Sequence, residues 1–123
     1  IMEKVKIIAS ALIIQNEKIL TIKLSEDGNN DIYITPGGRP ELGETLRDCA
    51  IRETKEEVGV DIKILDIAGI QEKPYDDGLW TIIYYNAEII NGKAMNGEPE
   101  EIKSVEWIDI QDLDGYSDIK WFH

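Results

Sequence analysis

The sequence predicts one mixed α/β domain over residues 1–123. Its length lies in the range of about 100–150 residues that is commonest for a single domain. Hydrophobic residues make up 42% of the chain and charged residues 31%, a balance that disfavours disorder. Several apolar segments have the pattern of strands and surround one segment that has the pattern of a helix, an order typical of an α/β fold. Ile1, which precedes Met2, is interpreted as a residue left by cloning.

The first part of the chain is predicted to form a β-hairpin followed by a short strand. Residues 5–14 are a nearly continuous aliphatic run, and residues 18–24 alternate between two faces, as in a half-buried strand. The polar residues 15–17 lie between them and are expected to form the turn. A strand at 32–35 is expected to run into a tight turn at Pro36-Gly37-Gly38, because proline cannot donate to a ladder and glycine permits unusual backbone angles.

One segment, residues 45–58, carries the strongest helix signal. It contains helix-forming residues and neither glycine nor proline. Thr45, followed three residues later by Asp48, has the pattern of an N-terminal cap, and Gly59 is a typical helix stop. We therefore expect one helix that ends at Val58.

The second half of the chain is predicted to return to strands. Residues 79–90 are rich in Ile, Tyr and Trp, as long strands are. The other expected elements are a strand at 60–70, a polar loop at 74–78, a loop at 91–101, a last clear strand at 102–108, and one or two short helical turns within 109–122.

The charge and the cysteine count exclude several classes of function. The formal charge is −12 and the pI is near 4.4, so binding to a nucleic-acid polymer or to an anionic membrane surface is disfavoured. Cys49 is the single cysteine and His123 the single histidine, which excludes an internal disulfide and a Cys/His zinc site. A reducing compartment follows, and we expect a cytoplasmic protein. Because imidazole is scarce, acid–base chemistry is expected to use carboxylates.

Three carboxylates of the predicted helix share one face. At about 100° per residue, Glu53, Glu56 and Glu57 lie within a sector of about 100°. Each like-charge pair at i,i+3 or i,i+4 costs about 0.2–0.5 kcal/mol on an isolated helix, so local stability does not favour this arrangement. The apolar stripe that would dock on the sheet lies beside them and consists of Ala50, Ile51, Thr54 and Val58.

Two interpretations of this acidic face are open from the helix alone. Hard oxygen ligands with little cationic compensation suit Mg²⁺ or Mn²⁺. The alternative is a solvated acidic surface, which is supported by Arg52, because its guanidinium can pair with Glu56 at i+4.

The segment that precedes and includes the helix resolves this choice. Reading from Gly38 to Val60, the chain resembles the Nudix box, G-x5-E-x7-R-E-U-x-E-E-x-G-U, of the MutT-like Nudix hydrolases, where U is a bulky aliphatic residue. The one departure is Thr54 at an aliphatic position, which lies on the sheet-facing stripe and bears on stability more than on catalysis. The polar and glycine positions that match the signature are Gly38, Glu44, Arg52, Glu53, Glu56, Glu57 and Gly59.

The resemblance implies a fold and an activity. The implied fold is an α/β/α sandwich around a mixed sheet, with the box forming a loop–helix–loop catalytic motif. The implied reaction is Mg²⁺- or Mn²⁺-dependent hydrolysis of a nucleoside diphosphate linked to another group, by attack of water on phosphorus. A nucleoside triphosphate or a related small nucleotide is the expected substrate. The oligomeric state is left open, with a homodimer among the alternatives.

The resemblance also implies roles for individual residues. The metal-ligand carboxylates correspond to Glu53, Glu56 and Glu57, and the Gly37 carbonyl is expected as a further ligand. Glu44 is expected to support the site, and Arg52 to orient a carboxylate and offset part of the repulsion.

The general base has two candidate sources. Glu53 is our first choice, because no histidine is available. In this family the base can instead come from a glutamate in a later loop, which makes Glu98, Glu100 and Glu101 rival sources of a base or a fourth ligand. The alternative for each of these three is a solvated loop residue.

Substrate contacts are the least constrained by sequence. Arg39 and Lys23 are candidates for phosphate contacts, although each is otherwise an ordinary surface charge. Aromatic residues could stack on a base, yet strand aromatics more often pack in the core. Cys49 is expected to be a packed small residue rather than a nucleophile. The aromatic candidates are Tyr75 and Trp80, with Tyr33, Tyr84 and Tyr85 beside them.

Two other classes of function are kept. A Nudix-fold module that binds a nucleotide without cleaving it would commonly lose box residues, and the intact box favours an enzyme. An acidic interaction or divalent-ion-binding protein without catalysis would explain the charge but not the glycine spacing.

Overall fold

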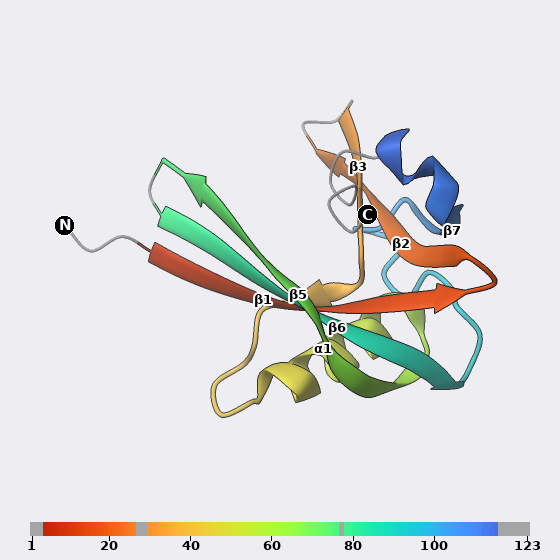
Figure 1. Ribbon diagram of the computed structural model, residues 1–123, viewed down its shortest axis with the longest axis horizontal. Coiled ribbons are helices and arrows are strands. Elements are labelled where there is room, and N and C mark those ends of the chain that lie inside the picture. The colour runs from red at the N-terminus through yellow and green to blue at the C-terminus, as the bar shows by residue number, and fades with distance from the viewer. Residues whose placement is uncertain (1–3, 27–29, 77, 116–123) are drawn as a thin grey trace.

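The computed structural model describes residues 4–26, 30–76 and 78–115 and confirms the predicted mixed class (Figure 1). Seven strands form one sheet, packed by a single α-helix within the described residues. The elements are β1 (Lys4–Gln15), β2 (Lys18–Glu26), β3 (Asn30–Ile34), β4 (Gly37–Gly38), α1 (Leu46–Val58), β5 (Asp61–Tyr75), β6 (Gly78–Asn91), β7 (Ser104–Asp109) and the 3-10 helix η1 (Ile110–Gly115).

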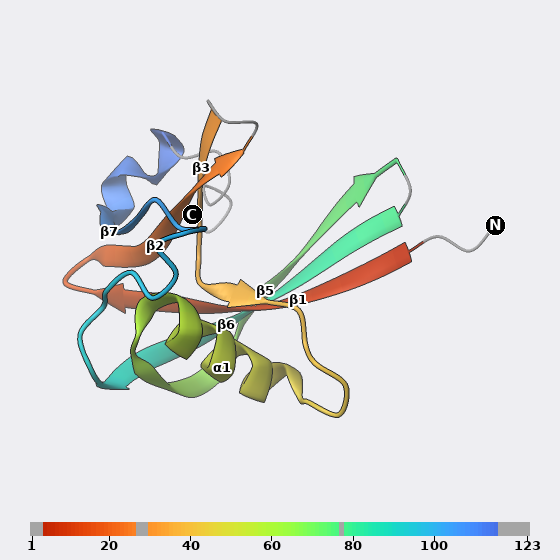
Figure 2. The ribbon, with the colours of Figure 1, turned by 180° about the vertical axis from the view of Figure 1, so that it is seen from behind.

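Strand β1 organises the sheet. The strand order is β3-β2-β1-β6-β5, with β4 paired to β1 and β7 paired to β2. The first ten residues of β1 pair in parallel with β6, from Lys4↔Gly78 to Ile13↔Ala87, whereas its last residues pair antiparallel with β2. One long strand therefore joins two sub-sheets that face in different directions (Figures 1 and 2).

The predicted hairpin is confirmed, and its turn is tight. Asn16 and Glu17 both have positive φ, 52° and 63°, and directly connect the two strands. This backbone matches the right-handed twist of the paired strands. The Glu17 carbonyl also accepts a 2.9 Å hydrogen bond from the amide of Ile110, which attaches η1 to the hairpin.

Helix α1 begins and ends where the sequence predicts. The Thr45 hydroxyl accepts a 3.1 Å hydrogen bond from the Asp48 amide, and Gly59 adopts a left-handed conformation with φ 76°. The buried side chains Cys49 and Ala50 pack on Ala9 and Tyr85 of the sheet. Small residues at these positions let the helix approach β1 closely. Figure 2 shows α1 on one face of β1, β5 and β6, whose far ends extend beyond it.

The main core lies where α1 meets both sub-sheets. Val58 and Val60, at the end of the helix and just after it, join residues from β1, β2, β5, β6 and the loop after β6. The helix terminus that carries the acidic residues is therefore anchored at the centre of the fold. This cluster consists of Ala11, Ile13, Leu20, Ile22, Val58, Val60, Ile62, Ala87 and Ile102.

Two local predictions are wrong. Gly37–Gly38 is not a free turn but the short strand β4, paired with Ser10 and Ala9 of β1. Pro74 does not begin a loop, because β5 continues to Tyr75 and β6 begins at Gly78. β5 is an edge strand, where proline is tolerated because its missing N–H need not join a ladder.

The C-terminal prediction is confirmed in part. The 3-10 helix η1 supplies one of the short helical turns expected within 109–122. The remainder of that range, from residue 116, lies outside the described residues. Within the described part of the chain, no helix is long and apolar enough to cross a membrane.

Thr54 is expected to reduce the stability of this packing. Its side chain is fully buried against the sheet, and its hydroxyl has no hydrogen-bond partner among the described residues. Thr54→Val keeps the shape and removes the unsatisfied group, so we expect the free energy of unfolding to rise by about 1 kcal/mol in urea titrations.

Thr21→Val is the matched control. Thr21 is equally buried, but its hydroxyl donates a 2.8 Å hydrogen bond to the Glu106 carbonyl. This variant is expected to lose about 1 kcal/mol. A loss of stability in Thr54→Val would contradict the interpretation of its hydroxyl.

Candidate functional site

Two of the helix carboxylates lie against the two glycines of β4. The Gly37 amide donates a 2.9 Å hydrogen bond to Glu57 Oε1. The Glu53 carboxylate lies so close to Gly38 that a Cβ at Gly38 would overlap it. Glu53 and Glu57, predicted to share a helix face, are thus brought together with Gly37, the predicted carbonyl ligand.

The glycines of β4 are required for close approach rather than for unusual backbone angles. Neither has a positive φ. A Cβ at Gly37 would lie 2.5 Å from the Ala9 carbonyl oxygen and 2.7 Å from Ser10 Cα. β4 therefore fits between β1 and the helix carboxylates only because both of its residues lack side chains.

Loss of solvent contact raises the pKa values of Glu53 and Glu57 in the metal-free protein. Burial raises the pKa of Glu57 to about 8, although the hydrogen bond from Gly37 opposes this shift. Burial likewise raises the pKa of Glu53 to about 7; the charges of Glu56 and Glu98 add to this, and Arg52 opposes it. A cation placed between these groups would favour their charged forms.

Arg52 donates hydrogen bonds to the loop that precedes α1. Its Nε and Nη2 donate to the two oxygens of Glu44 at 2.7 and 2.9 Å, a bidentate pair, and Nη2 reaches the Arg39 carbonyl at 3.3 Å. The hydrogen bonds from Arg52 and from the Glu41 amide lower the pKa of Glu44 to about 2. This pair therefore joins the two arms of the loop–helix motif.

The same guanidinium also reaches the acidic face. Its Nη1 lies 3.1 Å from Glu56 Oε1 and 3.6 Å from Glu53 Oε2. The i,i+4 pair with Glu56 that favoured a solvated surface is therefore present. Among the described residues, none of the ion pairs of Arg52 reaches Glu57. Arg52 thus offsets only part of the repulsion on this face.

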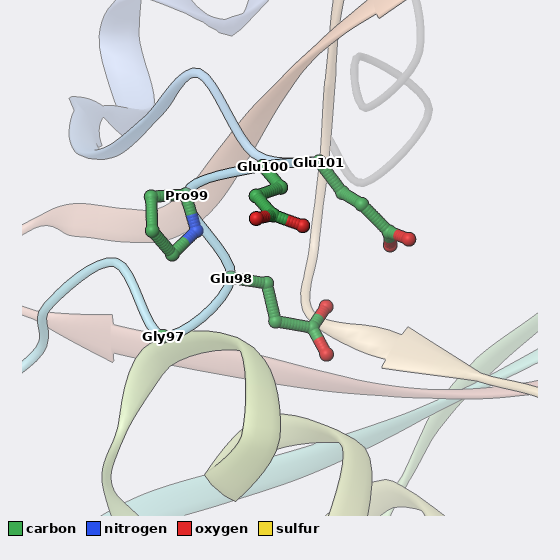
Figure 3. A pocket seen from close by; sticks show the side chains of 5 residues that line it. All are labelled: Gly97, Glu98, Pro99, Glu100 and Glu101. Carbon is green, nitrogen blue, oxygen red and sulfur yellow. The ribbon is translucent and has the colours of Figure 1, made fainter.

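The loop between β6 and β7 carries the second acidic group. Gly97, Glu98, Pro99, Glu100 and Glu101 line an open pocket of about 350 Å³. Figure 3 shows the Glu98 side chain extending over α1 toward β4, whereas the Glu100 and Glu101 side chains begin farther from the helix along the loop. Of the three rival glutamates, Glu98 is the one whose charge adds to the raised pKa values of both Glu53 and Glu57.

The donor set fits a hard divalent cation, although its geometry is not preformed. Glu53, Glu56 and Glu57 carry carboxylate oxygens toward the C-terminal end of α1, where the helix dipole is negative and favours a cation. Within the described residues, no group of three acidic, histidine or cysteine side chains is gathered as a metal site. Glu57 accepts its present hydrogen bond from the Gly37 amide, and Glu53 and Glu56 lie near Arg52.

A second depression lies beside Gly37 on the sheet face opposite α1. It has a volume of about 190 Å³ and meets a pocket of about 270 Å³ at Trp80 and Ile82. Lys6 Nζ lies 4.7 Å from the centre of the Trp80 ring. Trp80, a predicted substrate contact, therefore shares a pocket with Gly37. The smaller pocket is lined by Ile8, Ser10, Ile34, Thr35, Gly37, Trp80, Ile82 and Tyr84.

Two of the other aromatic candidates, Tyr85 and Tyr33, lie away from this pocket. Tyr85 points to the opposite face, where it is buried beneath α1. Tyr33 packs beside Ile19 and Leu12 in a separate cluster. Tyr84 does line the pocket, but it is 4% exposed. Tyr75 ends β5, and its side chain lies outside the described residues.

The remaining candidates have ordinary partners. Arg39 is exposed and contributes its backbone carbonyl to Arg52. Lys23 Nζ lies 3.5 Å from Asp31 Oδ2, an ion pair. Cys49 is fully buried, its thiol donates to the Gly38 carbonyl, and burial raises its pKa to about 11, which supports a packing role.

Sequence reasoning missed the residues that attach the Glu98 loop to the helix. The amides of Met95 and Gly97 donate to the carbonyls of Val58 and Glu57. A glycine just before an acidic run was the available signal, but the position of the loop depends on tertiary contacts.

Comparison with known proteins gives a family match over nearly the whole chain. Residues 5–123 match the model of the NUDIX domain. The NAD-capped RNA hydrolase NudC of Pseudomonas putida strain KT2440 is 33% identical over 82 residues, covering 67% of this chain and 29% of that protein. The ADP-ribose pyrophosphatase of Methanocaldococcus jannaschii is 31% identical over 104 residues, covering 83% of this chain and 60% of that protein. The chain thus spans about 30% of the length of the NudC relatives.

Solved structures agree on the fold. The MutT NUDIX hydrolase from Burkholderia pseudomallei superposes with a TM-score of 0.82 at 22% identity, covering 90% of this chain and 88% of that one. The MutT protein from Methanosarcina mazei Go1 gives a TM-score of 0.83 at 21% identity, covering 99% and 92%. At these identities the likeness concerns the fold.

The raised pKa values predict how stability depends on pH in the metal-free protein. Between the ordinary pKa of 4.5 and about pH 8, the folded chain keeps protons on Glu53 and Glu57 that the unfolded chain releases. Stability should therefore fall as the pH rises from 5 to 8, measured as the urea midpoint in EDTA. Glu57→Gln removes one of these groups and should flatten the slope.

Glu88→Gln is the control for this experiment. Glu88 is an exposed strand residue, so the variant makes the same change of charge away from the site and should keep the slope. Stability that stays constant or rises between pH 5 and 8 would contradict the assigned shifts.

Proposed function

Since residues 5–123 match the NUDIX domain, the chain belongs to the Nudix hydrolase family, and from this premise we propose that it is a divalent-cation-dependent pyrophosphohydrolase. Its substrate would be a nucleoside diphosphate linked to another group, with a nucleoside triphosphate or a related nucleotide as first choice. Residues 1–123 would act as one catalytic domain. The observation that carries the proposal is the partial burial of Glu53 and Glu57 beside the Gly37–Gly38 backbone, where the loss of solvent disfavours the charged form of each carboxylate.

The cation would be held by Glu53, Glu56 and Glu57, with the Gly37 carbonyl as a further ligand. Mg²⁺ is the expected ion and Mn²⁺ the alternative, since both prefer carboxylate oxygens. When bound, the ion would neutralise phosphate charge and lower the pKa of the attacking water. The raised pKa values of Glu53 and Glu57 support this assignment, because residues at functional sites often have shifted pKa values.

Two glutamates remain candidates for the general base. Glu53, with a pKa of about 7, is suited to accept a proton from water near neutral pH. Glu98 is the rival, because its side chain extends over α1 toward the same space (Figure 3). Either residue can also be a cation ligand, in which case the other would take the proton.

Arg52 and Glu44 would hold the motif in shape rather than react. Their bidentate pair ties the loop to the helix, and Arg52 Nη1 lies between Glu53 and Glu56. This arrangement keeps the acidic face ordered before a cation binds.

The substrate base would lie in the pocket beside Gly37, against Trp80. The pocket is mostly apolar and adjoins the strand that carries the proposed carbonyl ligand, so a base in it can leave its phosphates at the cation. Arg39 and Tyr75 are kept as secondary candidates for substrate contacts. One relative is named an ADP-ribose pyrophosphatase, which supports nucleoside diphosphates with a further group.

A nucleic-acid polymer and a membrane surface remain disfavoured as partners because the chain carries a charge of −12. Another relative is named an NAD-capped RNA hydrolase, and an NAD-capped RNA is therefore included among the substrates to test. A cytoplasmic location is part of the same proposal.

The second candidate function is nucleotide binding without cleavage. The pocket beside Gly37 that contains Trp80 could hold a nucleotide base whether or not the phosphates are cleaved. The presence of every box carboxylate at its family position favours the enzyme.

Hydrolysis should require both the cation and Glu53. With Mg²⁺ or Mn²⁺, we expect product release from at least one of the nucleoside triphosphates, ADP-ribose, dinucleoside polyphosphates, nucleotide sugars or NAD-capped RNA. EDTA should abolish it, and Glu53→Gln should lower kcat by about 10²–10⁴-fold, because a base or ligand is lost.

Glu88→Gln is the control and should keep wild-type kcat. Equal turnover by wild type and Glu53→Gln would contradict the role of Glu53. Nucleotide binding in calorimetry without turnover of any substrate would favour the binding module.

Trp80→Leu should weaken substrate binding more than chemistry. Loss of a stacking surface worth about 1–3 kcal/mol predicts a KM about 10-fold higher with kcat little changed. Trp107→Leu is the matched control, because Trp107 lines a different pocket, at the β1–β2 turn. An unchanged KM in Trp80→Leu would contradict the proposed base site.

A further inference from the structure

The end of α1 is capped by the loop that follows β6. The last carbonyls of a helix lack partners within the helix and need donors from elsewhere. Here the Met95 amide donates to the Val58 carbonyl at 2.9 Å, and the Gly97 amide donates to the Glu57 carbonyl at 2.8 Å. The loop that carries Glu98 is therefore hydrogen-bonded to the turn of the helix that carries Glu57.

At Gly97 the loop packs directly against the backbone of α1, and no space is left for a side chain. A Cβ at this position would overlap the Glu56 carbonyl oxygen and lie 3.2 Å from the Glu57 carbonyl oxygen. The obstacle is backbone and cannot rotate away. Gly97 is also not among the glycines with positive φ, so another residue would be excluded by contact and not by its own conformation.

The loop beyond this contact is internally braced. The Asn96 side chain accepts a 3.0 Å hydrogen bond from the Glu98 amide and donates a 2.7 Å bond to the Ile102 carbonyl. The Ile102 amide in turn donates to the Glu98 carbonyl at 2.8 Å, and the Ile102 side chain is buried in the main core. The backbone of Glu98 is therefore held between the helix contact at Gly97 and the buried Ile102.

Glu98 is the next residue, and its side chain extends from the contact over α1 toward β4 (Figure 3). It is partly buried, and its charge contributes to the raised pKa values of Glu53 and Glu57. These observations place the Glu98 carboxylate within electrostatic range of both helix carboxylates. The position of this carboxylate depends on how closely residue 97 approaches the helix.

We propose that Gly97 is a positioning residue, which holds the Glu98 carboxylate over the Glu53–Glu57 pair by allowing the loop to contact the α1 backbone directly. This inference rests on the proposed function for its catalytic consequence. A side chain at residue 97 would push the loop away from the helix by about 1 Å, and a displacement of that size can cost about 10- to 100-fold in rate.

The test is a double-mutant cycle with Gly97→Ala and Glu98→Gln. Two quantities are measured for the four proteins: kcat on the substrate found in the screen, and Mn²⁺ affinity by isothermal titration calorimetry. In the wild-type background, Gly97→Ala should lower kcat about 10- to 100-fold, with a smaller change in KM, and weaken Mn²⁺ binding several-fold. In the Glu98→Gln background it should change both by less than about 3-fold, because its effect acts through Glu98.

The thermal midpoint separates positioning from stability. Gly97→Ala is expected to lower the midpoint equally in both backgrounds, since the contact it disturbs is with the helix backbone. If Gly97→Ala fails to fold, Asn96→Ala replaces it in the cycle, because it removes the two brace bonds without adding a side chain. Lys93→Ala, at an exposed site in the same loop, should leave kcat and Mn²⁺ affinity unchanged.

The outcomes distinguish this inference from the proposed function. If Gly97→Ala lowers kcat and Mn²⁺ affinity equally in both backgrounds, the positioning role is overturned and the hydrolase activity stands. The same conclusion follows if Gly97→Ala keeps the wild-type kcat and Mn²⁺ affinity. Non-additive Mn²⁺ affinities in a protein that hydrolyses none of the substrates would support positioning and overturn the proposed hydrolysis.

Discussion

Close contact between the glycine strand β4 and the acidic end of α1 is the constraint on which the rest of the site depends. Gly37 and Gly38 have no side chains, so Glu53 and Glu57 are partly buried against their backbone, where the negative charge of each carboxylate is disfavoured. Burying a carboxylate without a cation costs free energy, and natural sequences retain such groups mainly where function requires them. The stability of this region and its proposed chemistry are therefore linked through the same two side chains.

Arg52, the arginine of the signature, relieves only part of this cost. Arg52 directs its bidentate contact to Glu44 in the preceding loop and only approaches Glu53 with its remaining nitrogen. The motif thus contains a neutralised Arg52–Glu44 pair, which ties the loop to the helix, and a partly buried pair, Glu53 and Glu57, which we propose to bind a cation. A charge of −12 is compatible with an anionic substrate under this arrangement, because a divalent ion can bridge the acidic face to phosphate. Elsewhere the acidity remains best explained as solubility.

Two structural layers meet at Gly37. On one side of β4 lie the helix carboxylates and the Glu98 loop, and on the other lies the pocket that contains Trp80. The β4 backbone separates the proposed chemistry from the proposed recognition of the base. Changes of substrate preference can then arise on the sheet face without disturbing α1, because the two regions share backbone and few side chains.

The sequence by itself determined the helix, its caps and the spacing of its carboxylates, because these depend on residues within a few positions of one another. It also determined the family, since the box is a local pattern. Only the tertiary structure decided which distant residues join the site. Strand register places Trp80 in the pocket and Tyr85 beneath α1, and the contact of Gly97 with the helix lies directly before Glu98, the loop glutamate that we propose for the site. A shift of one residue in a strand reverses the face of every side chain, and neither register nor loop docking is encoded in local spacing.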